Sequence, residues 1–317
     1  MGQPILITGG AGFLGVHIAR ALIQRGDPVV IYDNLSTGLS QNVAGFQDRT
    51  KLVNGDILDL SFLLRTLIAE KVKRIIHAAA LVSFAPSVEK PVLTAKINIE
   101  GTLNILEASR IAGVERVMDV SSEEVYGPFQ YEPADEDHPF SPTAPYAISK
   151  VAGEGFGQFY HRFFGLDVVT IRTSWVYGPG LPRARPPKTF IENGLRGIPT
   201  EMVSGSDHRI DHTYIDDFVQ GALLAFDVKN PKHRVFNISS GRAYTFKEMA
   251  QMVIQIIPSA TITVGPGLLP YSEGIEGPQK GALNIHRAQS ELGYQPHYDL
   301  FEGLKRYVNS IRKEKSL

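Results

Sequence analysis

The glycine spacing near the N-terminus constrains the fold of this chain more than any other feature. Gly9, Gly12 and Gly15 follow a short apolar run, 4–8, and open an amphipathic stretch, 14–24. Glycines at this spacing permit a tight turn, let a diphosphate approach the backbone, and allow close packing of helix on strand. The start of a helix also offers unpaired N–H groups and a partial positive charge to an anion. The sequence therefore predicts a strand, a phosphate-binding turn and a helix.

The rest of the first half alternates β-branched runs with amphipathic stretches, which is typical of a parallel sheet with crossover helices. Strands covered on both faces are continuously apolar, and right-handed crossovers make such a sheet doubly wound. The strands we expect are 4–8, 29–33, 51–53, 74–78, 116–121 and 168–173, and the helices between them include 14–24, 60–70, 92–112 and 146–164.

The acidic residue at the end of the second expected strand indicates the cofactor. Asp33 lies 18 residues beyond Gly15. A carboxylate at this place accepts hydrogen bonds from the adenosine ribose hydroxyls and repels a 2′-phosphate, which favours NAD over NADP. Asp56 and Ile57 end the third strand, at the rim where an adenine would lie. We therefore expect NAD.

The character of the chain changes after about residue 175. The segment 177–187 holds four prolines, which argues against a regular element there, and a loop rich in charge and histidine follows a helix at 189–196. Further on we expect helices at 216–226, 246–257 and 300–313 and a strand at 235–239. The fold class predicted is α/β, a Rossmann-like doubly wound parallel sheet with a smaller C-terminal substrate-binding lobe. We expect the NAD-binding domain over 1–174, joined again by 210–240, and the smaller lobe over 175–209 and 241–317.

Composition excludes several function classes. The chain of 317 residues has a formal net charge of −1, which gives no reason to expect a nucleic acid or an acidic membrane as partner. It contains no cysteine, so disulfides, thiolate metal sites and cysteine nucleophiles are excluded. His208, Asp211 and His212 fit no standard metal-ligand spacing, and no metal is expected. With neither a targeting segment nor an apolar stretch of about 20 residues, we expect a cytoplasmic protein.

A tyrosine and a lysine stand one helical turn apart in the stretch 146–164. Tyr146 and Lys150 share a helix face, so the ammonium stabilises a phenolate on its neighbour. Such a tyrosine can exchange a proton with a carbinol oxygen while a nicotinamide takes or gives hydride.

These motifs, in this order, resemble the extended short-chain dehydrogenase/reductase family, and within it the NAD-dependent epimerase/dehydratase group of UDP-glucose 4-epimerase-like nucleotide-sugar enzymes. The resemblance runs nearly from end to end. It is carried by Asp33-Asn-Leu-Ser-Thr-Gly38, His77-Ala-Ala-Ala80, Asn98 with Gly101-Thr102, Ser121-Ser-Glu-Glu-Val-Tyr-Gly127, Tyr177-Gly-Pro179, Tyr214-Ile-Asp-Asp217 and Leu292-Gly-Tyr-Gln-Pro296.

The resemblance implies roles for individual residues. Ser122 would hydrogen-bond the reacting sugar oxygen, Tyr146 would be the acid/base, and Lys150 would hold the nicotinamide ribose. The residues expected at the cofactor are Gly9, Gly12, Phe13, Leu14, Gly15, Asp33, Asn34, Thr37, Gly38, Asp56, Ile57, Ala78, Ala79, Ala80, Asn98, Tyr146 and Lys150. The resemblance also implies a homodimer that packs 92–112 and 146–164 into a four-helix bundle.

The reaction itself is left open by the sequence. The leading interpretation is an NAD-dependent epimerase of a nucleotide sugar, most simply a UDP-hexose 4-epimerase acting through a 4-keto intermediate. Glu124 occupies the place of a catalytic acid in related dehydratases and decarboxylases, so a lyase is the first alternative. Glu123 and Glu124 are equally compatible with solvated rim residues or a turn cap.

The substrate side departs from the family pattern. Trp175 stands where many members have a diphosphate-binding asparagine, and Arg209 and Lys280 are the cations left to meet phosphates. A dehydrogenase of a sugar or sugar acid without a nucleotide is therefore a second alternative. An NAD-sensing regulator without turnover is a third, against which the Ser–Tyr–Lys set argues.

Overall fold

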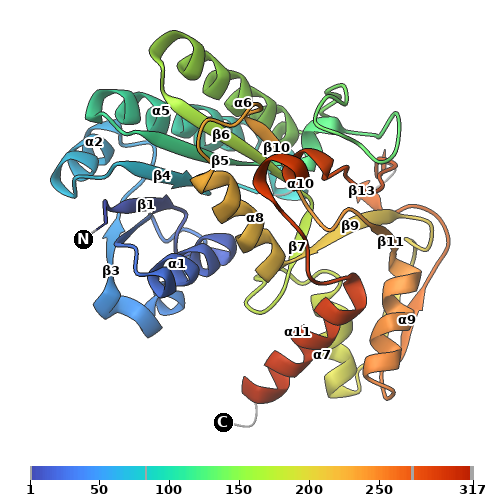
Figure 1. Ribbon diagram of the computed structural model, residues 1–317. Coiled ribbons are helices and arrows are strands. Elements are labelled where there is room, and N and C mark those ends of the chain that lie inside the picture. Colours follow the sequence, from blue (N-terminus) through green and yellow to red (C-terminus); the bar gives the residue numbers. More distant parts are fainter. Residues whose placement is uncertain (1, 83, 273–274, 315–317) are drawn as a thin grey trace. The chain divides into compact units, whose positions relative to one another are not determined.

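The computed structural model describes residues 2–82, 84–272 and 275–314. A seven-stranded sheet, formed mostly by strands from the first half of the chain, organises the fold. Its strands are β1 (Ile5–Thr8), β2 (Val29–Asp33), β3 (Thr50–Asn54), β4 (Arg74–His77), β5 (Arg116–Ser122), β6 (Asp167–Thr173) and β10 (Val235–Ile238). They lie in the order β10-β6-β5-β4-β1-β2-β3 (Figure 1). β1 pairs in parallel with β2 and β4, β2 with β3, and β4 with β5. The predicted Rossmann-like parallel sheet is confirmed.

Helices pack on this sheet, and apolar side chains of the helices and strands together form the core. The helices include α1 (Phe13–Arg25), α2 (Leu60–Ala69), α5 (Gly101–Ala112) and α6 (Pro145–Phe164). The residues of β1 and β2 are buried along the whole of both strands, as expected of strands covered on both faces. On the face packed by α2, α5 and α6, one apolar cluster joins residues of the sheet and of these helices, among them Leu6, Val30, Ile75, Val117, Val168, Leu63, Leu67, Ile105, Leu106 and Tyr160.

The stretch 92–112 is not the single helix that its periodicity predicts. It consists of α4 (Pro91–Ala95), a π-helical turn (Lys96–Glu100) and α5, and α3 (Phe84–Glu89) precedes it. A π turn holds one residue more than an α turn, so it changes which side chains face inward. Here it includes Asn98, which is buried.

The chain forms two compact units. The first comprises Met1–Val125, Phe140–Arg172 and Ala222–Phe236, and the second comprises Tyr126–Pro139, Thr173–Gly221 and Asn237–Leu317. Helix α8 (Ile215–Asp227) contributes residues to both units, as does β10.

The second unit contains small sheets that the sequence pattern did not predict. β9 (Arg209–Tyr214) pairs in parallel with β7 (Trp175–Tyr177) and antiparallel with β11 (Ala243–Thr245). β8 (Thr200–Met202) pairs with β12 (Ile262–Val264), and β13 (Pro270–Ser272) with β14 (Ile275–Glu276). The helices here are α7 (Lys188–Arg196), α9 (Phe246–Ile256), α10 (His286–Leu292) and α11 (Leu300–Glu314). The prediction of a loop between 197 and 215 was wrong, since β8 and β9 lie in this stretch. The buried residues of β9 include Asp and His, and these polar residues do not give the apolar pattern by which a buried strand is recognised.

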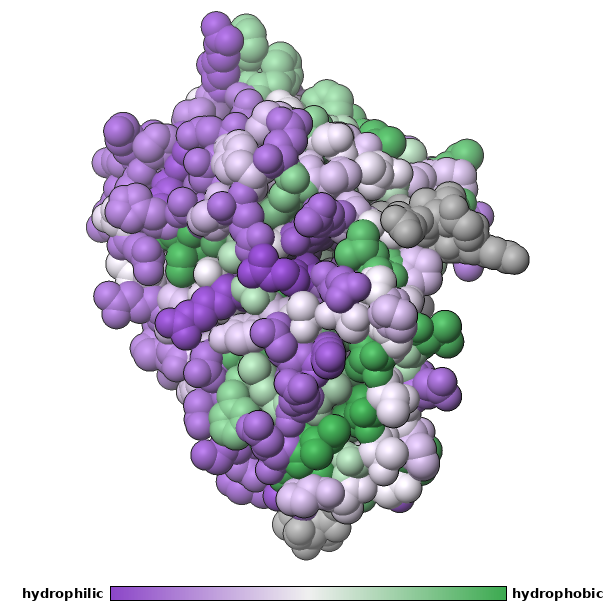
Figure 2. Space-filling view, turned by 90° about the vertical axis from the view of Figure 1, so that its right-hand side faces the viewer, coloured by the Kyte–Doolittle hydropathy of each residue, from purple (hydrophilic) through white to green (hydrophobic). Residues whose placement is uncertain are grey.

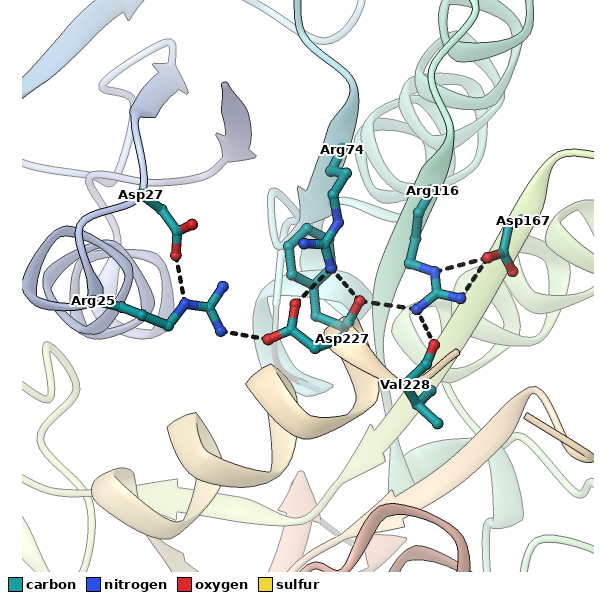
Figure 3. A network of polar contacts seen from close by, with 8 residues as sticks. Arg25, Asp27, Arg74, Arg116, Asp167, Asp227 and Val228 are labelled. Atoms are coloured by element: carbon teal, nitrogen blue, oxygen red, sulfur yellow. Dashed lines mark hydrogen bonds and ion pairs between the residues drawn. The ribbon is translucent and has the colours of Figure 1, made fainter. Parts of the chain in front are cut away.

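At the amino-terminal edge of the large sheet, polar contacts join the starts of the strands to the end of α8, within the first unit (Figure 3). Arg74, at the start of β4, donates to the carboxylate of Asp227 at 2.7 Å, and its guanidinium lies over the Phe226 ring. Arg116, at the start of β5, donates to the Phe226 carbonyl at 3.0 Å and to Asp167 at 2.8 Å. In parallel α/β sheets ligands bind at the opposite, carboxyl-terminal edge, and the predicted site residues at strand ends lie there.

The surface is mixed in polarity. On the face drawn in Figure 2, hydrophilic residues predominate and apolar residues gather in smaller groups between them. This agrees with a mean hydropathy of −0.07. Among the described residues no helix is both long and apolar enough to cross a bilayer.

Candidate active site

The glycine turn between β1 and α1 is packed so closely that side chains are excluded from it. Gly9 has φ +66°, and a Cβ on it would lie 2.8 Å from the backbone of Ala79. A Cβ on Gly15 would lie 2.3 Å from the carbonyl oxygen of Gly9. Gly12 is the N-cap of α1 and is only half-buried, so the open side of the turn presents bare backbone at the start of a helix. These features fit a dinucleotide diphosphate.

Asp33 organises the neighbouring turn. Its side chain is buried at the end of β2, and its carboxylate accepts hydrogen bonds from the N–H groups of Ala11 (3.0 Å) and Leu35 (2.8 Å). A Cβ on Gly38 would lie 2.8 Å from the same carboxylate. The acidic side chain that the sequence assigned to the ribose thus holds together the turns that contain Ala11 and Leu35.

The other predicted cofactor residues lie in the same unit. Asp56 accepts a hydrogen bond from the amide of Asn34 at 3.0 Å. The Asn98 amide is bonded in both directions to the backbone of Leu81, at 2.8 and 3.0 Å, and donates to Ser149 Oγ at 2.9 Å. Asn98 therefore ties the turn after β4 to α6. The remaining predicted cofactor residues of the unit are Phe13, Leu14, Thr37, Ile57, Ala78 and Ala80.

His77, the last residue of β4, is a buried, neutral histidine. Burial, with the nearby Lys150 charge, lowers the pKa of His77 to about 3. Its ring nitrogens lie 2.7 Å from Thr8 Oγ1 and 3.0 Å from Thr102 Oγ1. Because the ring is uncharged, one nitrogen donates and the other accepts, so His77 links β1 through β4 to α5.

Ser122, Tyr146 and Lys150 belong to two elements that pack on each other, β5 and α6. Ser122 is the last residue of β5, and its Oγ accepts the N–H of Glu124 at 3.2 Å. A hydroxyl that accepts one hydrogen bond can still donate its own hydrogen. Lys150 is buried, and its Nζ donates to the carbonyl of Val120, two residues before Ser122, at 2.7 Å. Tyr146 lies in the first turn of α6 and is half-buried.

Two acidic residues near this strand end differ in environment. Glu123 is only 1% exposed, so its interpretation as a solvated rim residue was wrong. Glu124 is half-buried. Asp119, which lies deeper in β5, is also buried, and burial raises its pKa while Lys150 opposes the shift. Its Oδ1 has no hydrogen-bond partner among the described residues.

Sequence reasoning missed a buried cluster behind the catalytic candidates. Glu154 and Arg172 form an ion pair at 2.7 Å, and each is 2% exposed. Ser121 Oγ donates to the same carboxylate at 2.5 Å. The available signal was the spacing of Glu154, four residues after Lys150 on α6.

The predicted substrate residues Trp175, Arg209 and Lys280 all belong to the second unit. The Arg185 guanidinium lies over the Trp175 ring, 4.4 Å from its centroid. Arg209 is paired with Glu132 at 2.7 Å, and both side chains are partly exposed. Lys280 is 5% exposed. A cation–π contact and two cations are thus present in the lobe expected to hold the substrate.

Asp211, considered above as a metal ligand, is used by the protein itself. It accepts hydrogen bonds from Ser239 Oγ at 2.9 Å, from Ser240 Oγ at 2.6 Å, and from the Leu283 N–H at 3.2 Å. Burial raises its pKa to about 6, and these donors lower it. Asp211 thus joins β9 to two loops of the second unit.

Comparisons with known proteins cover almost the whole chain. The family model of GDP-mannose 4,6 dehydratase matches residues 6–307. A putative UDP-glucose 4-epimerase of Methanocaldococcus jannaschii is 34% identical, over 97% of this chain and 98% of the relative.

Solved structures agree. The UDP-glucose 4-epimerase of Thermotoga maritima with UDP-glucose superposes with a TM-score of 0.89 at 31% identity, covering 99% of this chain and 100% of that one. A dTDP-glucose 4,6-dehydratase of Streptomyces venezuelae, solved with NAD bound, gives 0.87 at 28% identity, covering 99% and 98%. With the glycine turn, Asp33 and the Ser–Tyr–Lys arrangement, these matches show that the chain belongs to the NAD-dependent epimerase/dehydratase family of nucleotide-sugar enzymes, within the extended short-chain dehydrogenases/reductases.

Proposed function

We propose that the protein is a nucleotide-sugar epimerase, most simply a UDP-hexose 4-epimerase. The observation that carries the proposal is the grouping of Ser122, Tyr146 and Lys150 on β5 and α6, in the unit that also holds the glycine turn. The end-to-end similarity to UDP-glucose 4-epimerases supports it.

The residues divide the chemistry between them. When bound, NAD supplies a hydride acceptor and donor for the sugar carbon. Tyr146 accepts the proton of the sugar hydroxyl as the carbon is oxidised and returns a proton to the oxygen as it is reduced. Ser122 donates a hydrogen bond to that oxygen while its Oγ accepts the Glu124 N–H. Lys150, anchored to Val120, would bind the nicotinamide ribose and places a positive charge one helical turn from Tyr146.

The first unit would bind the cofactor and the second the sugar nucleotide. Gly9, Gly12 and Gly15 would face the diphosphate, and Asp33 the adenosine ribose. In the second unit, Arg209 and Lys280 supply positive charge for the substrate phosphates, and Trp175 an aromatic face.

A lyase remains the second candidate because of Glu124. Glu124 is half-buried and lies two residues after Ser122, and its backbone N–H donates to Ser122 Oγ. A carboxylate there could remove a proton from a carbon beside a new ketone, as a dehydratase or decarboxylase requires. Trp175, in place of the usual asparagine, is the observation in favour of a dehydrogenase of a sugar without a nucleotide.

Proton NMR of the enzyme with NAD and UDP-glucose, UDP-galactose or UDP-glucuronate separates these candidates. We expect a new anomeric signal at unchanged mass. Loss of water or carbon dioxide would instead establish a lyase. If none of the three UDP-sugars gives a product, the proposal is contradicted, and a substrate without a nucleotide or a regulator without turnover is favoured.

The variant Glu124→Gln makes the same distinction within one protein. An epimerase needs no acid at this place, so the variant should keep turnover within about threefold of the parent. A loss of a hundredfold or more, on the scale of a missing general acid or base, would place Glu124 in the reaction.

We also propose that two copies of the chain pair through α4, α5 and α6. These helices carry a set of exposed apolar side chains, Val92, Leu93, Ile111, Ile148, Phe159, Phe163 and Phe164. An apolar surface of this kind favours burial against a partner. Sedimentation should give twice the chain mass, and Phe163→Glu should give the monomer. Val203→Glu is the matched control, because Val203 is 88% exposed in the second unit and its substitution should leave the dimer intact.

A further inference from the structure

The helix that carries the catalytic candidates carries a third functional group at the same spacing. Tyr146, Lys150 and Glu154 follow one another at intervals of four on α6, so they share one helix face. Glu154 is 2% exposed, and its carboxylate lies against the sheet rather than solvent. A buried carboxylate needs a counter-charge and hydrogen bonds, and both come from strands of the large sheet.

Arg172 on β6 supplies the counter-charge. Its Nε donates to Glu154 Oε1 at 3.0 Å and its Nη2 donates to Oε2 at 2.7 Å, so both carboxylate oxygens are engaged. The guanidinium also lies over the ring of Phe140, 4.8 Å from its centroid. The ion pair is therefore held on more than one side, within a single unit of the chain.

Ser121 adds a bond that the ion pair does not require. Its hydroxyl is 2% exposed and donates to Glu154 Oε1 at 2.5 Å. Ser121 directly precedes Ser122 in β5, and neighbouring side chains leave a strand on opposite faces. Fixing the Ser121 hydroxyl on α6 therefore fixes the backbone from which the Ser122 hydroxyl projects.

We propose that Ser121, Glu154 and Arg172 form a positioning clamp that holds Ser122 in register with Tyr146 and Lys150. This inference rests on the proposed function of those three residues. The clamp touches neither substrate nor cofactor: it acts by joining the end of β5 to the face of α6 on which the acid/base tyrosine lies. Displacing a reacting group by about 1 Å costs on the order of a hundredfold in rate, so such a link has a measurable effect.

Ser121→Ala is the sharpest test, because it removes the link and leaves the Glu154–Arg172 pair intact. We expect kcat to fall about tenfold to a hundredfold, with KM, NAD affinity and melting temperature nearly unchanged. Ser109→Ala is the matched control. Ser109, in α5, is 0% exposed, and its hydroxyl donates to the Ile105 carbonyl at 2.6 Å within the same helix. Loss of this hydroxyl should leave kcat unchanged.

A double-mutant cycle adds a second criterion. Glu154→Gln weakens both contacts, and in combination with Ser121→Ala it should lower kcat by no more than Glu154→Gln alone, because both changes break one link. If kcat of Ser121→Ala equals that of the parent, or falls only together with the melting temperature, the clamp is refuted. If the parent itself turns over no nucleotide sugar, the proposed function fails instead, so the two failures are distinct.

Discussion

Replacing Gly15 by alanine separates close packing at the glycine turn from ordinary helix propensity. Gly15 lies inside α1, where alanine is favoured over glycine by about 1 kcal/mol. The structure predicts the opposite sign. The added Cβ would lie 2.3 Å from the Gly9 carbonyl oxygen and 2.6 Å from the Gly10 Cα, whereas 3.4 Å is an ordinary contact. Both neighbours are backbone atoms, so the turn itself must move by about 1 Å.

The magnitude follows from that displacement. Overpacking of this kind costs about 1–3 kcal/mol, which outweighs the gain in helix propensity. Because the moved atoms form the diphosphate turn, we expect NAD affinity to fall at least tenfold, equivalent to about 1.4 kcal/mol. Isothermal titration calorimetry measures the affinity, and thermal unfolding without NAD measures the stability. Gly155→Ala in α6 is the control, since its Cβ would meet no atom within 4 Å and NAD affinity should be unchanged. Unaltered NAD binding and stability in Gly15→Ala would refute the reasoning.

The remaining predictions concern single polar groups. Tyr146→Phe should bind NAD as the parent does and lose at least about a hundredfold in turnover, measured by NMR; full activity would exclude it as the acid/base. NAD should bind at least tenfold more tightly than NADP, and Asp33→Asn should narrow that ratio in calorimetric titrations; equal affinities in the parent would contradict the role of Asp33. Burial raises the pKa of Asp119 above its ordinary value of 3.8. Folding therefore favours the protonated carboxyl, and the folded state loses stability as pH rises from 3.8 through the raised pKa. Asp119→Asn should therefore raise the free energy of unfolding, measured with urea, more at pH 8 than at a pH below 3.8, and an equal effect at both would count against this reasoning.

The sequence was most informative where one short segment carries both structure and chemistry. The turn from Gly9 to Gly15, with a strand before it, a helix after it and Asp33 at the end of the second strand, is typical of a dinucleotide fold, so the sheet and its cofactor could be predicted. Lys150 was found for the same reason, one helical turn after Tyr146. The Ser121–Glu154–Arg172 cluster could not be derived in this way. Its members come from three elements, and each residue alone resembles an ordinary polar side chain.

The second unit was harder to predict because its strands are short and their buried residues are polar. Asp211 and His212 lie in β9, where periodicity indicates a loop and pairing with β7 and β11 decides otherwise. Burial lowers the pKa of His212 to about 3, so the ring is neutral at physiological pH and behaves as a packed aromatic side chain against Trp175. Tertiary pairing and neutralisation by burial are not encoded in local patterns.

The Glu132–Arg209 pair bears on the proposal that Arg209 meets a substrate phosphate. Both side chains are partly exposed, at 33% and 46%, and an exposed ion pair contributes only about 0–1 kcal/mol. Exchanging the carboxylate for a substrate phosphate is therefore inexpensive, and the pair does not argue against a nucleotide diphosphate. The pair also has a structural use, because Glu132 accepts the Ala282 N–H at 2.9 Å, two residues after Lys280. Glu132 thus connects the two predicted phosphate-binding positions within the second unit. If a diphosphate drew Arg209 away from Glu132, that carboxylate would still accept the Ala282 N–H, in the segment that carries Lys280.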